Sequence, residues 1–421
     1  MASHGQRILT LVADPETGPE RLADRLYHDL LSPPEVRAVR EQVRKFASRS
    51  VAPIAHRIAD GDEQLDGFPR DVFEAMARDG LFRIPFAPEV GGEGFACFAT
   101  ATAVAVEELA YYSNSVAAMY TEHCVLAGVA LEQGSEQQRR RWLRPIVDGE
   151  IVGSFACTEP GVSGDLSPET VQTVAVPDGD EWLLTGRKRS ITNSVVAGVL
   201  VVLARTDAGP TTFIVPAATP GVTIGTPERK LGNRGQVTAD VMLDDVRLGP
   251  DAVLGAIGGG LRIAQQTLTW GRICHGAAGV GMAQAAFDHT VEHLRTRHAS
   301  DGSSASKQHW QFVMANYAAD LETIRSLYLK AALHLDAGET IPEPEAAMAR
   351  MRGTDLAARL ARDAVQAFGG LSLVQSLGAC DTGGPMEAIY RDSTFGELHQ
   401  DDNEIQRGIL TRHIFDRKDT R

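Results

Sequence analysis

The chain has 421 residues, of which 43% are hydrophobic and 23% charged, and its formal net charge is −14. Such a composition belongs to a globular protein with a large core, and it excludes disordered, collagen-like and coiled-coil chains. The acidic balance argues against a nucleic-acid-binding protein, because that class needs a basic face to neutralise phosphates.

Cysteine use and the N-terminus point to a reducing compartment. Scattered cysteines without CxxC spacing predict free, buried thiols and no metal site. These cysteines are Cys97, Cys124, Cys157, Cys274 and Cys380. The first ten residues lack the pattern of a signal or transit peptide, and nowhere do 18 apolar residues run together. We therefore expect a cytoplasmic protein without a membrane span.

The first third of the chain is predicted to be helical. Residues 1–30 are expected to form a loosely held extension, because prolines and glycines interrupt them. From residue 31 to 150 the apolar spacing is that of helices, with segments around Phe46 and Phe73. A longer apolar segment, 99–131, carries few charges, so we expect it to be buried on most sides.

The middle of the chain is predicted to be a small all-β domain over residues 151–255. There the apolar period changes to two, and glycines and prolines separate the β-rich runs. The runs are 171–176, 182–185, 199–204, 211–215 and 237–243.

Helical spacing returns over residues 256–421. The glycines at 258–260 carry no GxGxxG or Gly-Lys-Ser/Thr pattern, so we expect them only to start a helix, not to bind a nucleotide. Apolar residues from Ile273 to Leu294 fall on one stripe, and Arg295 and Arg297 follow at the negative end of the helix dipole. The sequence thus predicts two helical domains around a β domain.

The most informative segment is the run FACTEPGVSGD at 155–165, followed by Ile191-Thr192-Asn193. A strand end whose hydroxyls and backbone N–H groups face one way can bind the edge of a flavin ring and hold its pyrophosphate. The same residue types also form ordinary polar hairpin turns.

Together with other segments in matching order, this run resembles the acyl-CoA dehydrogenase family. The other segments are 35–60, 68–82, 230–248, 366–370, 390–392 and 403–407. The resemblance runs from about residue 35 to the end. It implies an α+β fold with an N-terminal α-helical domain (31–150), a middle small β-barrel domain (151–255) and a C-terminal four-helix bundle (256–421).

The resemblance implies FAD as the cofactor. Thr158 and the backbone around Cys157 would meet the pyrimidine side of the flavin, beside Phe155, and Thr192 would reach N5, the atom that accepts hydride. The chain also departs from the family pattern at several cofactor positions. These are Ser163-Gly164 in place of Gly-Ser, Ser190 in place of Trp, Ser300-Asp301 in place of Phe-Gly, and Asp402 in place of Thr.

The resemblance further implies a homodimer or homotetramer, in which a neighbouring subunit holds the adenine dinucleotide. Arg297 and Gln308 would supply a charge and an amide, and Gln366, Gly369 and Gly370 a close backbone approach. From the residues alone, Arg297 could instead cap a helix, Gln308 could lie at the surface, and the glycines could end a helix.

The catalytic base that the family pattern implies is missing. The usual glutamate position is Gln400, whose carboxamide cannot take a proton, and the alternative position is Gly271. His399 and His275 are the candidate bases, since histidine titrates near neutral pH; they could also be a surface residue and a core-edge residue. Asp401 and Asp402 are expected to cap the helix that Asn403 begins.

Three functions follow from these observations. The first is a flavin-dependent oxidoreductase that acts on an acyl thioester, on CoA or a carrier protein, with a non-standard base. The second is a reduced-flavin monooxygenase on the same fold, which needs no base for an α-proton. The third is a catalytically silent subunit of a heteromeric dehydrogenase.

Overall fold

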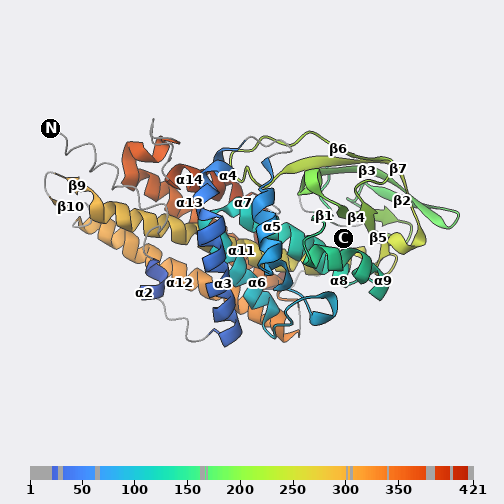
Figure 1. Cartoon of the computed structure of the whole chain (residues 1–421), viewed down its shortest axis with the longest axis horizontal. Coiled ribbons are helices and arrows are strands. Elements are labelled where there is room, and N and C mark those ends of the chain that lie inside the picture. The colour runs from blue at the N-terminus through green and yellow to red at the C-terminus, as the bar shows by residue number, and fades with distance from the viewer. Residues whose placement is uncertain are drawn as a thin grey trace.

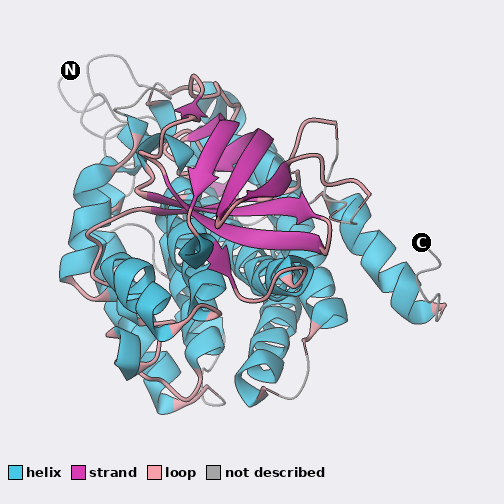
Figure 2. Cartoon of the chain, turned by 90° about the vertical axis from the view of Figure 1, so that its right-hand side faces the viewer, coloured by secondary structure: helices cyan, strands magenta, loops and turns pink. Residues whose placement is uncertain are grey.

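The computed structural model describes residues 21–26, 32–61, 67–161, 166, 169–299, 302–303, 307–338, 341–375, 385–398 and 402–415. The elements follow the predicted order of helices, strands and helices again. In Figure 1 the strands of the large sheet gather at the right-hand end of the long axis, helices fill most of the rest, and the short strands β9 (His298–Ala299) and β10 (Gly302–Ser303) lie at the left-hand end. Seen from the right-hand end, in Figure 2, the strands of the large sheet lie in front of the helices.

The N-terminal helices form where apolar residues recur at helical spacing. Helix α3 begins with Pro34, whose fixed φ suits a first helical position, and it buries Val36, Val39, Val43 and Phe46. The elements of this part are α2 (Leu22–Leu26), α3 (Pro34–Ser50), η3 (Ala52–Ile54), α4 (Ala55–Asp60), α5 (Arg70–Arg78), η5 (Leu81–Arg83), η6 (Pro88–Val90), α6 (Phe98–Tyr112), α7 (Asn114–Tyr120), η7 (Thr121–Gly128), α8 (Val129–Glu132), α9 (Glu136–Gln138), η8 (Arg139–Leu143) and α10 (Arg144–Val147).

The long apolar segment 99–131 is buried, as predicted, but it is not one regular helix. Ser113 has an extended backbone, with φ −158° and ψ 113°, and separates α6 from α7. Helix α7 then continues as the π-helix η7, which has one extra residue per turn and is fully buried. Such local widening of a helix is frequent at functional sites.

The β domain is one sheet of eight strands that curls around its own core. Along the sheet the order is β6-β7-β3-β2-β4-β5-β8, and β1 pairs in parallel with β4. Phe213 of β5 and Val241 of β7 share one core cluster, although their strands are not neighbours. The strands are β1 (Gly153–Ala156), β2 (Val174–Asp178), β3 (Glu181–Thr192), β4 (Val199–Thr206), β5 (Gly209–Pro216), β6 (Val222–Ile224), β7 (Thr238–Leu248) and β8 (Val253–Leu254).

Strand β4 joins the β domain to the helices. Its side chains alternate, so that Leu200 and Val202 enter the β core while Val199 and Val201 enter the helical core. Burial on both faces explains why this strand reads as a continuous apolar run. Each predicted run overlaps a strand, but the run 171–176 is a strand only from Val174 on, and the short β6 and β8 were not predicted.

The C-terminal helices pack around α11. The elements in the described part of this region are α11 (Gly260–Thr296), β9 (His298–Ala299), β10 (Gly302–Ser303), α12 (Gln308–Ala337), α13 (Glu343–Phe368), η12 (Gly369–Leu373), α14 (Pro385–Gly396) and α15 (Asn403–Ile414). Helix α11 starts at the glycines 258–260, as predicted. Its burial is broader than the predicted stripe, because nearly every residue from Thr267 to Asp288 is buried.

Glycines allow α11 to approach its neighbours closely. A Cβ added at Gly279 would lie 2.4 Å from the carbonyl carbon of Gly353 in α13. One added at Gly281 would lie 2.3 Å from the carbonyl oxygen of Glu107 in α6. Because neither backbone can give way without disturbing its helix, these positions require glycine.

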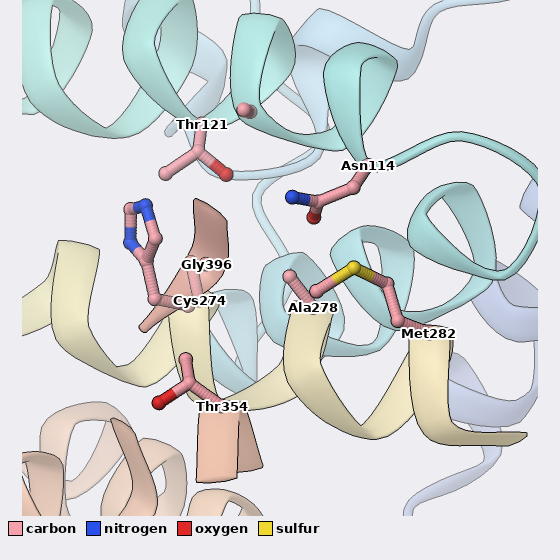
Figure 3. A pocket seen from close by; sticks show the side chains of 9 residues that line it. Asn114, Thr121, Cys274, Ala278, Met282, Thr354 and Gly396 are labelled. Atoms are coloured by element: carbon pink, nitrogen blue, oxygen red, sulfur yellow. The ribbon is translucent and has the colours of Figure 1, made fainter. Parts of the chain in front are cut away.

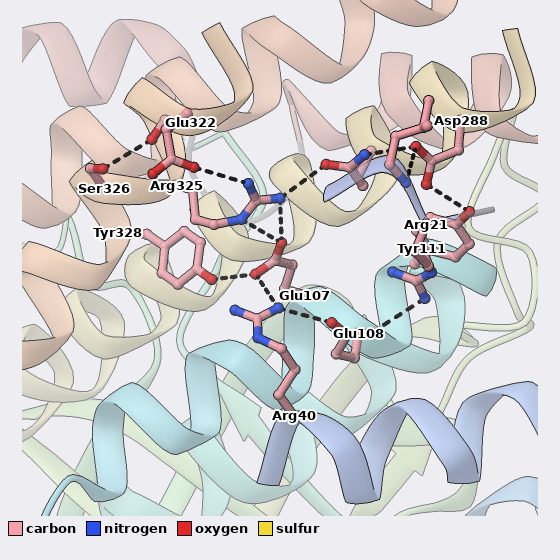
Figure 4. Close-up of polar contacts among 12 residues, drawn as sticks. Arg21, Arg40, Glu107, Glu108, Tyr111, Asp288, Glu322, Arg325, Ser326 and Tyr328 are labelled. Carbon is pink, nitrogen blue, oxygen red and sulfur yellow. Dashed lines mark hydrogen bonds and ion pairs between the residues drawn. The ribbon is translucent and has the colours of Figure 1, made fainter. Parts of the chain in front are cut away.

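A buried cluster of charges ties α3, α6 and α12 together (Figure 4). Arg40 lies 3.2 Å from Glu107 and 2.8 Å from Glu108, and Arg44 lies 3.1 Å from Glu108. From the other side, Arg325 of α12 lies 2.9 Å from Glu107. Burial by itself would raise the pKa of both carboxyl groups, but the guanidinium groups hold each pKa below its usual value.

The prediction of a loosely held N-terminal extension is wrong for residues 21–26. The Arg21 guanidinium lies 3.1 Å from the centre of the Tyr111 ring and 3.3 Å from Glu108. Leu22 is only 6% exposed, and its N–H donates to Asp288 at 3.3 Å. Cation–π, ionic and apolar contacts therefore fix this short piece against α6 and α11. The remainder of the predicted extension lies outside the described residues.

The cysteine prediction is confirmed in part. Cys124 and Cys274 carry free, buried thiols, whereas Cys97 and Cys157 are partly exposed, which corrects the prediction of burial for these two. Cys380 lies outside the described residues. Within the described ranges, no helix is long and apolar enough to cross a membrane. In the same ranges, no three His, Cys, Asp or Glu side chains gather as a metal ion would require.

The Gly279→Ala variant is expected to lower the free energy of unfolding by about 2 kcal/mol, because the new methyl group overpacks the contact of α11 with α13. Thermal unfolding of the purified protein measures this loss. The matched control is Gly408→Ala on α15, where a Cβ would meet nothing within 4 Å. This control should keep or raise stability, since alanine is the better helix former. Equal stability of the two variants would contradict the proposed packing constraint.

Candidate active site

The ends of strands β1 and β3 form an open edge that brings several predicted residues together. The Ser154 hydroxyl donates to the Thr192 carbonyl at 2.5 Å, and the Arg189 N–H donates to the Thr158 carbonyl at 2.9 Å. Thr158 is exposed and Cys157 partly exposed, while Thr192 is buried and only 5% exposed. The edge therefore presents a hydroxyl, a thiol and main-chain groups from two strands.

A buried ion pair anchors the turn after β1. Lys188 Nζ lies 2.7 Å from Glu159 Oε1 and 3.2 Å from the Cys157 carbonyl oxygen. Glu159 also accepts the N–H groups of Gln172, at 2.6 Å, and Thr173, at 2.9 Å. Burial alone would raise the pKa of Glu159, but Lys188 and these donors hold it below its usual value. The TEPG run is thus shaped by a glutamate that the sequence analysis did not single out.

Behind the edge, the π-helix η7 supplies a buried carboxyl. Glu122 Oε1 accepts the Phe155 N–H at 2.6 Å, and burial raises the pKa of Glu122 to about 8. The next residue, His123, bonds the Ile146 carbonyl at 3.0 Å and the Gly153 N–H at 3.1 Å, and burial lowers its pKa to about 3. Both side chains hold β1 in place.

Beside this edge, helices α7, η7, α11, α13 and α14 surround a pocket (Figure 3). The space between its walls, counted together with open solvent at its mouth, is about 320 Å³. In Figure 3 Asn114 and Thr121 lie on one side of the pocket, with Ala278 and Met282 opposite. The lining residues are Asn114, Ala118, Thr121, Cys274, His275, Ala278, Met282, Thr354 and Gly396.

His275 is the only candidate base that the structure describes, and it lines this pocket. Its Nδ1 lies 2.7 Å from the Gly271 carbonyl oxygen, one helical turn earlier. Burial, together with the positive charge of Arg350, lowers the pKa of His275 to about 4. At neutral pH the ring is therefore uncharged, with its hydrogen on Nδ1.

Other predicted residues have different surroundings. Ser190 is exposed, with φ +52°, and its hydroxyl donates to Glu228 at 2.8 Å. Asp402 caps α15 by accepting the Ile405 N–H at 3.0 Å, which confirms the predicted cap. His399, Gln400, Ser163 and Gly164 lie outside the described residues.

A second group of predicted residues lies at the far end of the C-terminal helices. Arg297 follows α11 and donates to the Ala367 carbonyl near the end of α13 at 3.0 Å, so it does cap a helix C-terminus. Gly369, with φ +64°, ends α13. Gln308 and Gln366 are exposed. Since 22 residues of helix rise about 33 Å, Arg297 is far from His275 in the same chain.

Most polar residues of the pocket wall, including Asn114, Thr121 and Thr354, were not predicted from the sequence. One available signal was the run of Asn114, Thr121, Glu122 and His123 inside an otherwise apolar helical segment. Buried polar side chains are costly, so such a run indicates a functional or structural task.

The residues at the edge fit a flavin. Gln236 Nε2 donates to Thr192 Oγ1 at 2.8 Å, so the Thr192 hydroxyl hydrogen can be donated elsewhere. Thr158 is exposed beside it, and although its carbonyl accepts the Arg189 N–H, its hydroxyl, 4.0 Å from the Cys157 sulfur, can reach a ligand. A flavin ring needs such donors and acceptors along its polar edge.

Comparison with known proteins identifies the fold. Three family descriptions match consecutive parts of the chain: the acyl-CoA dehydrogenase N-terminal domain at 33–150, its middle domain at 154–246 and its C-terminal domain at 258–415. The chain belongs to the acyl-CoA dehydrogenase family. The predicted fold and enzyme class, that of an FAD-dependent oxidoreductase family, are thereby confirmed.

Individual relatives cover nearly the whole chain. The mitochondrial short-chain specific acyl-CoA dehydrogenase of Rattus norvegicus is 33% identical over 395 residues, which is 92% of each chain. The 3-(aryl)acrylate reductase of Clostridium sporogenes is 32% identical and covers 89% of this chain and 97% of that protein. The structure of butyryl-CoA dehydrogenase from Megasphaera elsdenii superposes with a TM-score of 0.84 at 28% identity, covering 92% of this chain and 100% of that one.

The raised pKa of Glu122 predicts how stability depends on pH. Between about 4.5, the ordinary value, and about 8, the folded chain holds a proton that the unfolded chain has lost. The free energy of unfolding therefore falls as the pH rises through this window. Glu122→Gln keeps an acceptor for Phe155 and removes the titration. It is expected to raise the free energy of unfolding at pH 7 by about 3 kcal/mol.

Denaturant unfolding of both proteins at pH 5, 6, 7 and 8 measures this effect. The matched control is Glu404→Gln on α15, whose side chain is 79% exposed and should leave the pH dependence of the parent unchanged. A Glu122→Gln protein with the same slope as the parent would show that Glu122 does not retain its proton.

Proposed function

We propose that the chain is an FAD-dependent oxidoreductase that acts on an acyl thioester of CoA or of an acyl carrier protein. One observation carries the proposal: the strand edge and the pocket share the helix η7. Thr121 lines the pocket, and Glu122, the next residue, bonds the N–H of Phe155 in β1. A flavin at the edge and an acyl group in the pocket would thus be neighbours.

The cofactor roles follow the polar groups of the edge. When bound, FAD supplies a ring that accepts a hydride at N5. Thr192 would donate a hydrogen bond to N5, and Thr158 with the backbone at Cys157 would hold the pyrimidine side. The buried Glu159–Lys188 pair supports this role, because it keeps the turn in one shape.

We propose His275 as the group that takes the α-proton, because the resemblance to the family places Gln400 and Gly271 at the usual carboxylate positions. With its hydrogen donated to Gly271, the neutral ring can accept a proton at Nε2. The low pKa keeps the ring in this form at neutral pH, but it also makes His275 a weaker base than a desolvated carboxylate.

We further propose that two or four copies of the chain assemble. Arg297, Gln308 and Gln366 are exposed and lie far from the strand edge of their own chain. They would hold the adenine dinucleotide of a flavin bound at a neighbouring copy. Gly369 and Gly370, at the end of α13, would let the backbone approach it closely.

The visible spectrum and an anaerobic titration test the function. The purified chain is expected to be yellow, and a panel of acyl thioesters on CoA and on a carrier protein should bleach the flavin. A colourless protein that takes up no FAD would contradict the proposal and favour the silent subunit. A yellow protein that no thioester bleaches would contradict the dehydrogenase reaction but not the binding of FAD.

The His275→Gln variant is expected to slow flavin bleaching by about 10² to 10⁴, the usual contribution of a general base. Stopped-flow absorbance with a bleaching thioester measures the rate. In the parent this rate should be flat between pH 5.5 and 8, because His275 is already deprotonated above its pKa of about 4. A rate that rises through this range would assign the proton transfer to another group.

The companion variant is Gln400→Glu, which restores a carboxylate at the position implied by the family pattern. It should bleach faster than the parent, and it should restore bleaching to a His275→Gln protein. Failure in both backgrounds would contradict the placement of residue 400 beside the substrate.

The Arg297→Ala variant is expected to weaken FAD binding about tenfold, the effect of losing one charged hydrogen bond. Quenching of flavin fluorescence measures the affinity, and light scattering measures the assembly. The control is Arg362→Ala on α13, whose side chain is 69% exposed. Unchanged affinity in an assembled Arg297→Ala protein would rule out a role in holding the cofactor.

A reduced-flavin monooxygenase is the second candidate. The weak basicity of His275 favours it, because oxygen insertion by a reduced flavin needs no base for an α-proton. Reaction of the reduced protein with oxygen decides between the two. Hydroxylated product, formed with added reduced flavin and oxygen by a protein that thioesters do not bleach, would support this candidate.

A further inference from the structure

We propose that Asn114, Asn233 and Gln236 form an oriented chain of amides that makes the Thr192 hydroxyl a hydrogen-bond donor toward the flavin. This inference rests on the proposed FAD site. It adds three positioning residues that connect the wall of the substrate pocket with the cofactor edge.

The distances define one direction along the chain. Asn114 Nδ2 donates to Asn233 Oδ1 at 2.9 Å, and Asn233 Nδ2 donates to Gln236 Oε1 at 3.3 Å. Gln236 Nε2 then donates to Thr192 Oγ1 at 2.8 Å. The amide nitrogens are the donors in all three bonds, and Asn233 and Gln236 each accept the preceding bond on the side-chain oxygen, so every bond points from the pocket to Thr192.

This polarity decides what the Thr192 hydroxyl can do. A hydroxyl has one hydrogen and two acceptor positions. Since Gln236 points a hydrogen at the oxygen, the hydrogen of Thr192 has to point elsewhere, and within the described residues no acceptor receives it. It is therefore available as a donor at the end of β3, beside β1.

The three residues that carry the amides are buried and firmly held. Asn114 is 6% exposed, Asn233 1% and Gln236 0%. Asn233 has φ +53°, a left-handed conformation that asparagine tolerates better than most residues. Its main-chain N–H donates to Asp392 at 2.7 Å, while Lys230 Nζ donates to the main-chain carbonyl of Gln236 at 2.8 Å. These bonds hold the backbone that carries the two amides, and the side-chain bonds between the buried amides keep the amides in one orientation.

The two ends of this series of hydrogen-bonded amides contact different parts of the site. Asn114 lines the pocket together with His275, and Thr192 lies at the strand edge. A group that disturbs the Asn114 amide would therefore change the donor offered to the flavin. The amides themselves do not react, so Gln236 acts only through Thr192.

A double-mutant cycle in the full-length protein tests the proposal. Gln236→Met keeps the side-chain length and removes the amide, and Thr192→Val removes the hydroxyl at nearly constant volume. Each variant is expected to weaken FAD binding about fivefold, the effect of one neutral hydrogen bond. The double variant should bind FAD as the Thr192→Val protein does, since Gln236 acts through that hydroxyl. Fluorescence titration of the FAD-free protein gives all four affinities.

Two further variants separate positioning from folding. Gln236→Glu keeps the shape of the side chain, but an ionised carboxylate can only accept hydrogen bonds. The Thr192 hydroxyl would therefore point its hydrogen at this carboxylate and not at the flavin. The Gln236→Glu variant should weaken FAD binding at least as much as Gln236→Met. Gln284→Met removes another buried amide, one that bonds Arg325 and Asp288. It should lower the melting temperature and leave the FAD affinity of the parent unchanged.

The outcomes distinguish this inference from the proposed function. A parent protein without affinity for FAD would overturn both. A parent that binds FAD, with a Gln236→Met protein that binds it equally well, would overturn the amide chain alone. So would a double variant about 25-fold weaker than the parent, the product of two independent losses.

Discussion

The close packing of α11 against α6 and α13 is the constraint on which the rest of the structure depends. Glycines at 279 and 281 let backbones approach until no side chain fits between them. That contact fixes the height and rotation of α11, and with them the positions of His275, Ala278 and Met282 on the pocket wall. A helix buried on nearly all sides cannot rotate to accommodate a substrate, so the pocket shape belongs to the fold itself.

Around this core, buried charged groups connect the secondary-structure elements. They make these connections more specific than apolar contacts alone would. The Glu107 and Glu108 carboxylates connect α6 with α3 and α12, and the Glu159–Lys188 pair fixes the turn that follows β1. Each carboxylate is paired or accepts several donors, which is the condition under which burial of charge is tolerated. Glu122 is different, because among the described residues the Phe155 N–H is its one donor, and burial raises its pKa to about 8.

The site combines two kinds of surface. The strand edge offers exposed groups at Thr158 and Cys157 for a large planar cofactor, whereas the pocket is small and partly polar. Two sets of contacts connect them: η7, through Thr121 and Glu122, and the amides of Asn233 and Gln236. An acyl-CoA dehydrogenase fold thereby holds a site in which a neutral histidine stands on the wall where proton transfer is proposed.

The sequence by itself determined the order of helices and strands, the family and the cap at Asp402, because periodicity, motif spacing and capping are local properties. The polar run from Thr121 to His123 inside an apolar segment is also visible in the sequence, but the contacts of these side chains are not. Only the tertiary structure decided that Glu122 meets Phe155, that Lys188 pairs with Glu159, and that Arg21 and Leu22 are held rather than loose. Those contacts join residues far apart in the chain, and their free energies depend on burial, which no local pattern encodes.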